Sequence, residues 1–172
     1  MPTPPMLRQL RHDVWATEQL ISRCRSLTPE QLQLTVPGTY GTILRTLAHL
    51  VAADQRYLTR FVTIPDMFRE DHDVPLDELA RHMGDVKAGV EQLFAGQDFD
   101  PDREIRDPRR KPTDPPLLIT AWVLVTQFVH HGSDHRAHIG TILGAHGLET
   151  PDIDVWAYGR ANDGVKELAA PS

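Results

Sequence analysis

Histidines crowd one short segment of the chain and are the residues best suited to chemistry. The stretch FVHHGSDHRAHIGTILG holds four of them within nine positions: His130, His131, His135 and His138. Imidazole titrates near neutral pH and is a common metal ligand, so the spacing decides which of the four converge. Residues four apart on a helix have Cβ atoms about 5–6 Å from each other. His131 and His135 meet this condition and form a half-site for a divalent metal, whereas His130 points away and His138 lies toward the polar edge.

The spacing of His131 and His135 leaves a second interpretation open, in which both are hydrogen-bonded residues of a helical core or its edge. A third ligand favours a metal site, and the candidate is His49 in LRTLAHLVAADQRYL. On a helical wheel His49 falls on the side that carries Arg45, Arg56 and Arg60, which is typical of a surface residue. Small alanines beside it would also let a second helix approach and place His49 at the border of a cleft.

The bulk composition excludes several classes of protein. A chain of 172 residues with 40% hydrophobic content can bury a core without disulfides, and we expect a single domain over residues 1–172. The formal charge of −6 argues against a nucleic-acid surface, which needs clustered Lys and Arg to neutralise phosphates. Cys24 is the single cysteine, so any metal site must use histidine and carboxylate ligands. We expect Cys24 itself to be a small buried hydrophobe.

Neither a targeting segment nor a membrane segment is visible in the sequence. The N-terminal stretch MPTPPMLRQLRHDV lacks the apolar core of a signal peptide, and no run approaches the roughly 20 apolar residues that a membrane span needs. These observations predict a cytoplasmic protein that binds neither membranes nor nucleic acids.

Hydrophobic periodicity places the histidines on long helices. Apolar residues recur at steps near 3.6 in four segments, which predicts helices over about 6–27, 42–62, 75–94 and from 116 to 144 or 147. A capping box of Thr28 and Gln31 starts a short helix after the first one. No segment is a convincing strand, and the stretch QDFDPDREIRDPRRKPTDPP, rich in Pro and charge, is expected to be an exposed loop. The sequence therefore predicts an all-α four-helix bundle, with a further short helix possible in the C-terminal segment of about 151–172.

The predicted last helix carries an apolar stripe that we expect to face the core. Its members are Leu117, Leu124, Phe128, Ile139 and Ile142. At about 100° per residue, His135 falls inside this sector and His131 lies just beside it, so both imidazoles are directed toward the bundle interior. On the second predicted helix, Asp54 and Tyr57 face the core after His49, and each is either a partner of a metal ligand or purely structural.

Two of these segments resemble the DinB/YfiT-like family of metal-binding four-helix bundles. TYGTILRTLAHLVAADQRYL is similar to the family's second helix with its Leu-x-His-Leu element, and HGSDHRAHIGTILGAHGL is similar to the fourth. Together with SLTPEQL and TPDIDVWAY, the resemblance spans nearly the whole chain. It implies a DinB/YfiT-like fold and a metal triad of His49, His131 and His135.

The sequence departs from the family pattern at two points within the last helix. Asp134 stands where relatives have the first of two paired histidines, and Ala137 and His138 stand where they have Gly-Gln. His138 is a fourth ligand, a general base above an open coordination position, or a polar substitute for the glutamine. We favour the substitute, because the positions of the three ligands are intact.

A function follows from the inferred metal centre together with the resemblance. Three neutral imidazoles leave at least one coordination position open, as in catalytic rather than structural sites. The resemblance implies a thiol S-transferase in which a low-molecular-weight thiol, such as bacillithiol or mycothiol, attacks a small-molecule electrophile. It also implies a divalent metal cofactor, zinc or nickel first, with iron, manganese and copper as further options, and a homodimer. The alternative is a bundle without catalytic activity that binds a metal or ligand as a sensor or scaffold.

Overall fold

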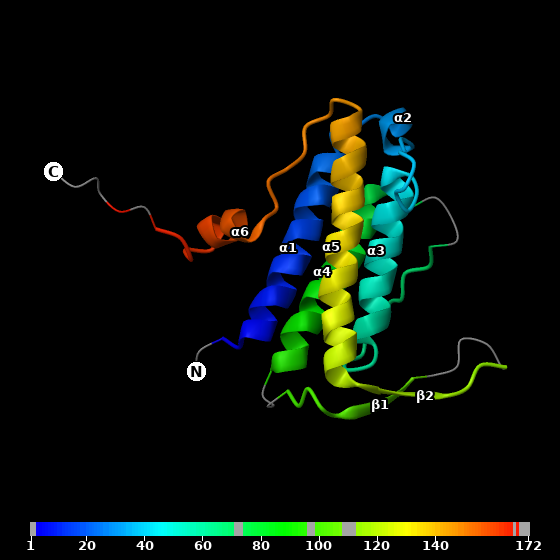
Figure 1. The fold of residues 1–172 in the computed structure, drawn as a ribbon, viewed down its shortest axis with the longest axis vertical. Coiled ribbons are helices and arrows are strands. Elements are labelled where there is room, and N and C mark those ends of the chain that lie inside the picture. Colours follow the sequence, from blue (N-terminus) through cyan, green and yellow to red (C-terminus); the bar gives the residue numbers. More distant parts are fainter. Residues whose placement is uncertain (1–2, 71–73, 96–98, 108–112, 167, 169–172) are drawn as a thin grey trace.

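Four long helices packed side by side form the body of the molecule (Figure 1). The computed structural model describes residues 3–70, 74–95, 99–107, 113–166 and 168. The long helices are α1 (Pro5–Cys24), α3 (Ile43–Leu58), α4 (Leu76–Phe94) and α5 (Ala121–Ala145). Both α1 and α3 pack against α4 and α5, so the four surround one core. In Figure 1, α1 and α5 run upward while α3 and α4 run downward. The predicted all-α bundle is confirmed.

Helix starts follow local sequence signals. Thr28 and Gln31 form the predicted capping box at the start of α2 (Pro29–Leu32). Thr42 caps α3 in a similar way, because its hydroxyl accepts a hydrogen bond of 3.2 Å from the backbone N–H of Arg45. The capped start fixes where α3 begins, at Ile43, six positions before His49.

The core is built from aliphatic side chains of all four long helices. Its largest fully buried members include Leu10, Leu47, Leu79, Phe128 and Ile139. Cys24 lies in the same core with no exposed surface, which confirms its predicted burial. Burial raises the pKa of its thiol to about 12, so this thiol is neutral and unreactive at physiological pH. None of the described helices is long and apolar enough to cross a membrane.

The expectation of a strandless loop between the last two long helices is wrong in part. Strands β1 (Glu104–Asp107) and β2 (Leu117–Thr120) pair antiparallel, with Glu104 opposite Thr120 and Ile105 opposite Ile119. Helix α5 consequently begins at Ala121, not near residue 116. Leu117 is also not a core residue, because it lies on β2 and is 54% exposed. Each strand is only four residues long and the intervening prolines dominate the composition, which concealed the pairing.

The C-terminal segment adds α6 (Val155–Ala161), which confirms the possible short helix. Asp154 caps it by accepting a 2.7 Å hydrogen bond from the backbone N–H of Ala157. This helix lies against α1 in Figure 1, where the Tyr158 ring is 5.4 Å from the Trp15 ring and 5.5 Å from the His12 ring, measured between centroids. The aromatic contacts hold the segment on the side of α1 away from α3.

Candidate metal centre

Three imidazoles from two helices converge between α3 and α5. His49 comes from α3, and His131 and His135 come from successive turns of α5. The Nε2 atom of His131 lies 3.2 Å from Nε2 of His49 and 3.0 Å from Nε2 of His135. One possible ligand atom from each of the three residues lies within 4.8 Å of the other two. The structure thus brings together all three histidines that the sequence analysis singled out.

The spacing of the nitrogens fits a shared cation. Bonds of about 2.0–2.1 Å to one metal ion place two ligand nitrogens about 2.9 Å apart at a right angle and about 3.4 Å apart at a tetrahedral angle. The observed separations of 3.0 and 3.2 Å fall inside that range. Each imidazole nitrogen either donates one proton or accepts one. The three converging nitrogens therefore cannot all be paired by hydrogen bonds to one another. The residues present therefore fit a divalent metal.

The electrostatics of the cluster favour neutral rings. Burial, together with the neighbouring His135 and His49 rings, lowers the pKa of His131 to about 4. Burial likewise lowers the pKa of His135 to about 4, with His49 and His138 as the next causes. A metal ligand must offer an unprotonated nitrogen, and both imidazoles do so at neutral pH.

His49 is oriented by a carboxylate that the sequence analysis did not identify. Its Nδ1 atom lies 2.9 Å from Oε2 of Glu70, and Oε1 of Glu70 accepts a 3.1 Å hydrogen bond from Arg56. A proton on Nδ1 would be donated to the carboxylate and would leave the lone pair of Nε2 directed toward His131. Carboxylate partners of this kind commonly fix the tautomer of metal-binding histidines. Nothing in the sequence links Glu70 to His49, because it follows 21 positions later in an irregular segment.

Two tyrosine rings border the cluster. Tyr40 stacks on His49 with centroids 4.3 Å apart and meets His135 edge-on at 4.9 Å. Tyr57 meets His131 edge-on, with ring centroids 5.8 Å apart. Its ring therefore contacts a candidate metal ligand, which was one of the two roles expected from the sequence. Tyr40 lies in the turn before α3. The path of this turn, rather than a helical repeat, places its ring beside the histidines. The side chain of His49 is 18% exposed, which matches the cleft position rather than the surface position.

The remaining histidines of α5 stay outside the cluster. His130 is 69% exposed and lies 3.5 Å from Asp134, as its place on the wheel predicted. The ring of His138 is 5.6 Å from that of His135, and His138 is not one of the residues whose ligand atoms converge. Its interpretation as a polar replacement stays a prediction.

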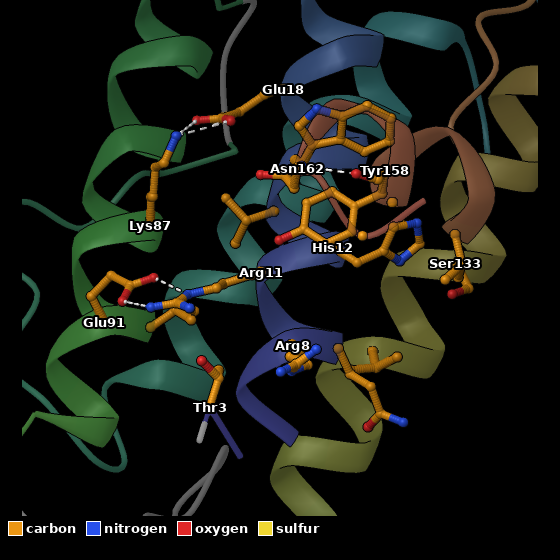
Figure 2. Close-up of a pocket in the computed structure, with 18 residues that line it drawn as sticks. Thr3, Arg8, Arg11, His12, Glu18, Lys87, Glu91, Ser133, Tyr158 and Asn162 are labelled. Carbon is orange, nitrogen blue, oxygen red and sulfur yellow. Dashed lines mark hydrogen bonds and ion pairs between the residues drawn. The ribbon is translucent and has the colours of Figure 1, made fainter. Parts of the chain in front are cut away.

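A groove on the far side of α5 does not contain the histidine cluster. It encloses about 930 Å³ between α1, α4, α5 and α6 (Figure 2). Val129 and Ser133 line it from α5, while His131 and His135 project about half a turn away on the same helix. Two ion pairs among its lining residues connect α1 to α4, one between Arg11 and Glu91 and one between Glu18 and Lys87, as Figure 2 shows. The histidine cluster between α3 and α5 is therefore separate from this groove.

The fold and the site together define a helical bundle protein with a cluster of three histidines between two of its helices. The chain belongs to the DinB family, whose sequence model matches residues 1–167. Among solved structures it is similar to a DinB-like protein from Bacillus cereus ATCC 10987, with a TM-score of 0.66 and 17% sequence identity. The match covers 85% of this chain and 93% of the other, and at this identity it shows the fold alone. No match was found among proteins of curated function.

Proposed function

We propose that this protein is a metal-dependent thiol S-transferase whose divalent cation is held by His49, His131 and His135. The convergence of three imidazole nitrogens at separations of 3.0 and 3.2 Å carries the proposal. With three protein ligands, such a centre keeps at least one position for a small molecule, as catalytic zinc sites do. The expected cation is zinc or nickel, with iron, manganese and copper as further options.

A bound cation at this site would supply a positive charge that lowers the pKa of a neighbouring thiol and favours its thiolate form. The chain's own residues supply orientation. Glu70 and Arg56 hold the ring of His49 in place, and Tyr40 and Tyr57 provide aromatic walls that limit how a substrate approaches. In the proposed reaction the S–H bond of a low-molecular-weight thiol breaks and its proton passes to solvent. The sulfur then forms a bond to the electrophilic carbon of a small molecule, while the bond from that carbon to its leaving group breaks and the leaving group departs with the bonding electron pair.

The test combines metal content and activity. His135→Ala should remove both, because two imidazoles bind a cation far less tightly than three. His130→Ala is the matched control on the same helix, and its 69% exposed ring should be dispensable for both. Bacillithiol, mycothiol and glutathione would each be offered with a panel of electrophiles. No reaction above the background of the free metal with any of these thiols would contradict the transferase proposal.

The second candidate function is a non-catalytic bundle that uses the same centre as a sensor or scaffold. The half-buried histidine cluster fits this function as well as it fits catalysis, because a metal bound there need not be catalytic. A metal-loaded protein that binds its cation through the three histidines but transfers no thiol would support this alternative.

We also propose that the protein forms a homodimer. Exposed apolar side chains gather around β2 and the start of α5, namely Leu117, Leu118, Trp122 and Val123. Such clusters on a protein surface often mark an interface. Light scattering at micromolar concentration should give twice the mass of one 19.4 kDa chain, and a value for a single chain would reject the dimer.

A further inference from the structure

Helix α5 is tied to α1 by a buried ion pair that the proposed reaction does not use. Arg136 and Asp13 are 5% and 0% exposed, and Nη2 of Arg136 donates a hydrogen bond to Oδ1 of Asp13. Nη1 of Arg136 donates to the backbone carbonyl of Asp13 and to the hydroxyl of Thr17, both at 3.2 Å. These contacts connect one side chain of α5 to two successive turns of α1.

A glycine makes this close approach possible. Gly132 lies one turn before Arg136 on the same face of α5. A Cβ atom at Gly132 would lie 2.6 and 2.7 Å from the carboxylate oxygens of Asp13 and 2.7 Å from Nη1 of Arg136. These separations are far inside van der Waals contact, so the carboxylate occupies the space that any larger residue would need. We call Asp13, Gly132 and Arg136 together the α1–α5 lock.

The lock and the histidine cluster use adjacent positions of α5. His131 and His135 immediately precede Gly132 and Arg136 in the sequence, so each imidazole lies about 100° around the helix axis from its neighbour in the lock. One pair faces α3 and the other faces α1. Any rotation or sliding of α5 that broke the contact with Asp13 would move the two imidazoles relative to His49 by a similar amount.

We propose that the α1–α5 lock is a positioning device for the metal centre, which sets the rotation and height of α5 so that His131 and His135 meet His49. A buried ion pair adds little net stability compared with apolar packing, because desolvation of the two charges opposes their attraction. Its best-attested use is to specify the register of packed helices. The inference rests on the proposed metal centre, but not on the thiol transfer.

The chain offers a matched pair of variants on α5. Gly132→Ala introduces the clash, whereas a Cβ atom at Gly144 would meet nothing within 4 Å. Both changes replace a glycine of α5 by alanine, and only the Cβ atom at position 132 meets Asp13 and Arg136, so a loss of Zn²⁺ affinity confined to Gly132→Ala reports this contact. The affinity for Zn²⁺, measured by competition with a chromophoric chelator, should fall about tenfold or more in Gly132→Ala and stay unchanged in Gly144→Ala. The ligand-field spectrum of bound Co²⁺ should change only in Gly132→Ala.

Two further measurements separate positioning from stability and from the proposed function. Leu79→Ala creates a cavity in the core of α4, so it should lower the melting temperature without weakening Zn²⁺ binding. Thr17→Val removes one acceptor of Arg136 and preserves the volume of the side chain. Like Gly132→Ala, it should weaken Zn²⁺ binding. It therefore tests the lock if Gly132→Ala does not fold.

In the metal-free protein, nuclear Overhauser contacts between the rings of His49 and His135 should be present in the wild type and Gly144→Ala and lost in Gly132→Ala. This contrast tests whether the lock sets the positions of the imidazole rings even if the wild type binds no metal, an outcome that would overturn the metal centre but not the effect of the lock on the rings. Equal Zn²⁺ affinities of Gly132→Ala and Gly144→Ala, with the ring contacts retained in both, would overturn the lock.

Discussion

The orientation of His49 depends on the carboxylate of Glu70, which holds Nδ1 at 2.9 Å. The sequence alone indicated His131 and His135 as a pair, because a spacing of four on a helix has one geometric meaning. It did not place His49, whose position on the wheel matched a surface residue, and only the family resemblance added it to the set. Glu70 and Tyr40 were missed because irregular segments bring them to the site and no periodicity describes such segments.

Glu70→Gln should weaken metal binding while leaving the fold intact. The amide oxygen can still accept a hydrogen bond from Nδ1 of His49, but the negative charge that favours this tautomer is lost. Changes to such partners of a ligand typically cost about tenfold or more in metal affinity. Isothermal titration with Zn²⁺ measures the effect, and Glu149→Gln, an exposed position outside the site, is the control. An affinity equal to that of the control would show that Glu70 does not orient the ligand.

Asp54 predicts a dependence of stability on pH. The side chain is fully buried, and neither of its carboxylate oxygens has a hydrogen-bond partner among the described residues. Burial raises the pKa of this carboxyl well above its usual value, and the nearby carboxylate of Asp13 raises it further. The folded state therefore keeps a proton that the unfolded chain releases. Stability from this group is present at low pH and is lost as pH rises through the folded pKa.

Asp54→Asn should abolish that loss, because an amide does not titrate. Urea unfolding at a series of pH values should show that the free energy of unfolding of the variant increases relative to that of the wild type as pH rises from about 5 to 9. Asp77→Asn, at an 88% exposed position, is the control. A constant difference between Asp54→Asn and the wild type over the whole range would mean that Asp54 carries no such proton.

At the scale of elements, long amphipathic helices were predictable and their ends were less so. The apolar stripe predicted the core face of α5 correctly from Leu124 onward. Leu117 fits the same helical period by chance, but it lies on strand β2. Four-residue strands contain too few alternations to reveal a pattern, and the pairing of β1 with β2 is a long-range contact. Helix α3 also ends at Leu58, before the predicted end near residue 62, because the apolar side chains that follow belong to a turn.

The N-terminal cap of α3 should contribute measurably to stability. Thr42→Ala removes the acceptor of the Arg45 N–H and should lower the free energy of unfolding by about 1 kcal/mol. Thr126→Ala, at an exposed position inside α5, has no cap to lose and should be neutral or slightly stabilising. Chemical denaturation of the two variants gives the comparison, and equal stabilities would show that the cap is not needed to start the helix.

At the scale of the molecule, composition and periodicity predicted the helical bundle, and the match of the DinB family model over residues 1–167 places the chain in that family. The position of α6 against α1 and the groove beside it depend on long-range packing of aromatic side chains, which no local pattern encodes. His131 and His135 follow His49 by 82 and 86 positions in the sequence, and the bundle brings them together. The site therefore exists only in the folded protein.

The central claim is that His49, His131 and His135 hold one divalent cation. Elemental analysis of protein purified without a metal-affinity tag, followed by Zn²⁺ titration of the wild type, His135→Ala and His130→Ala, tests it most directly. We predict one cation per chain in the wild type and His130→Ala, and none in His135→Ala at the same Zn²⁺ concentration. A wild type that binds no divalent metal, or a His135→Ala variant that retains wild-type affinity, would contradict the account.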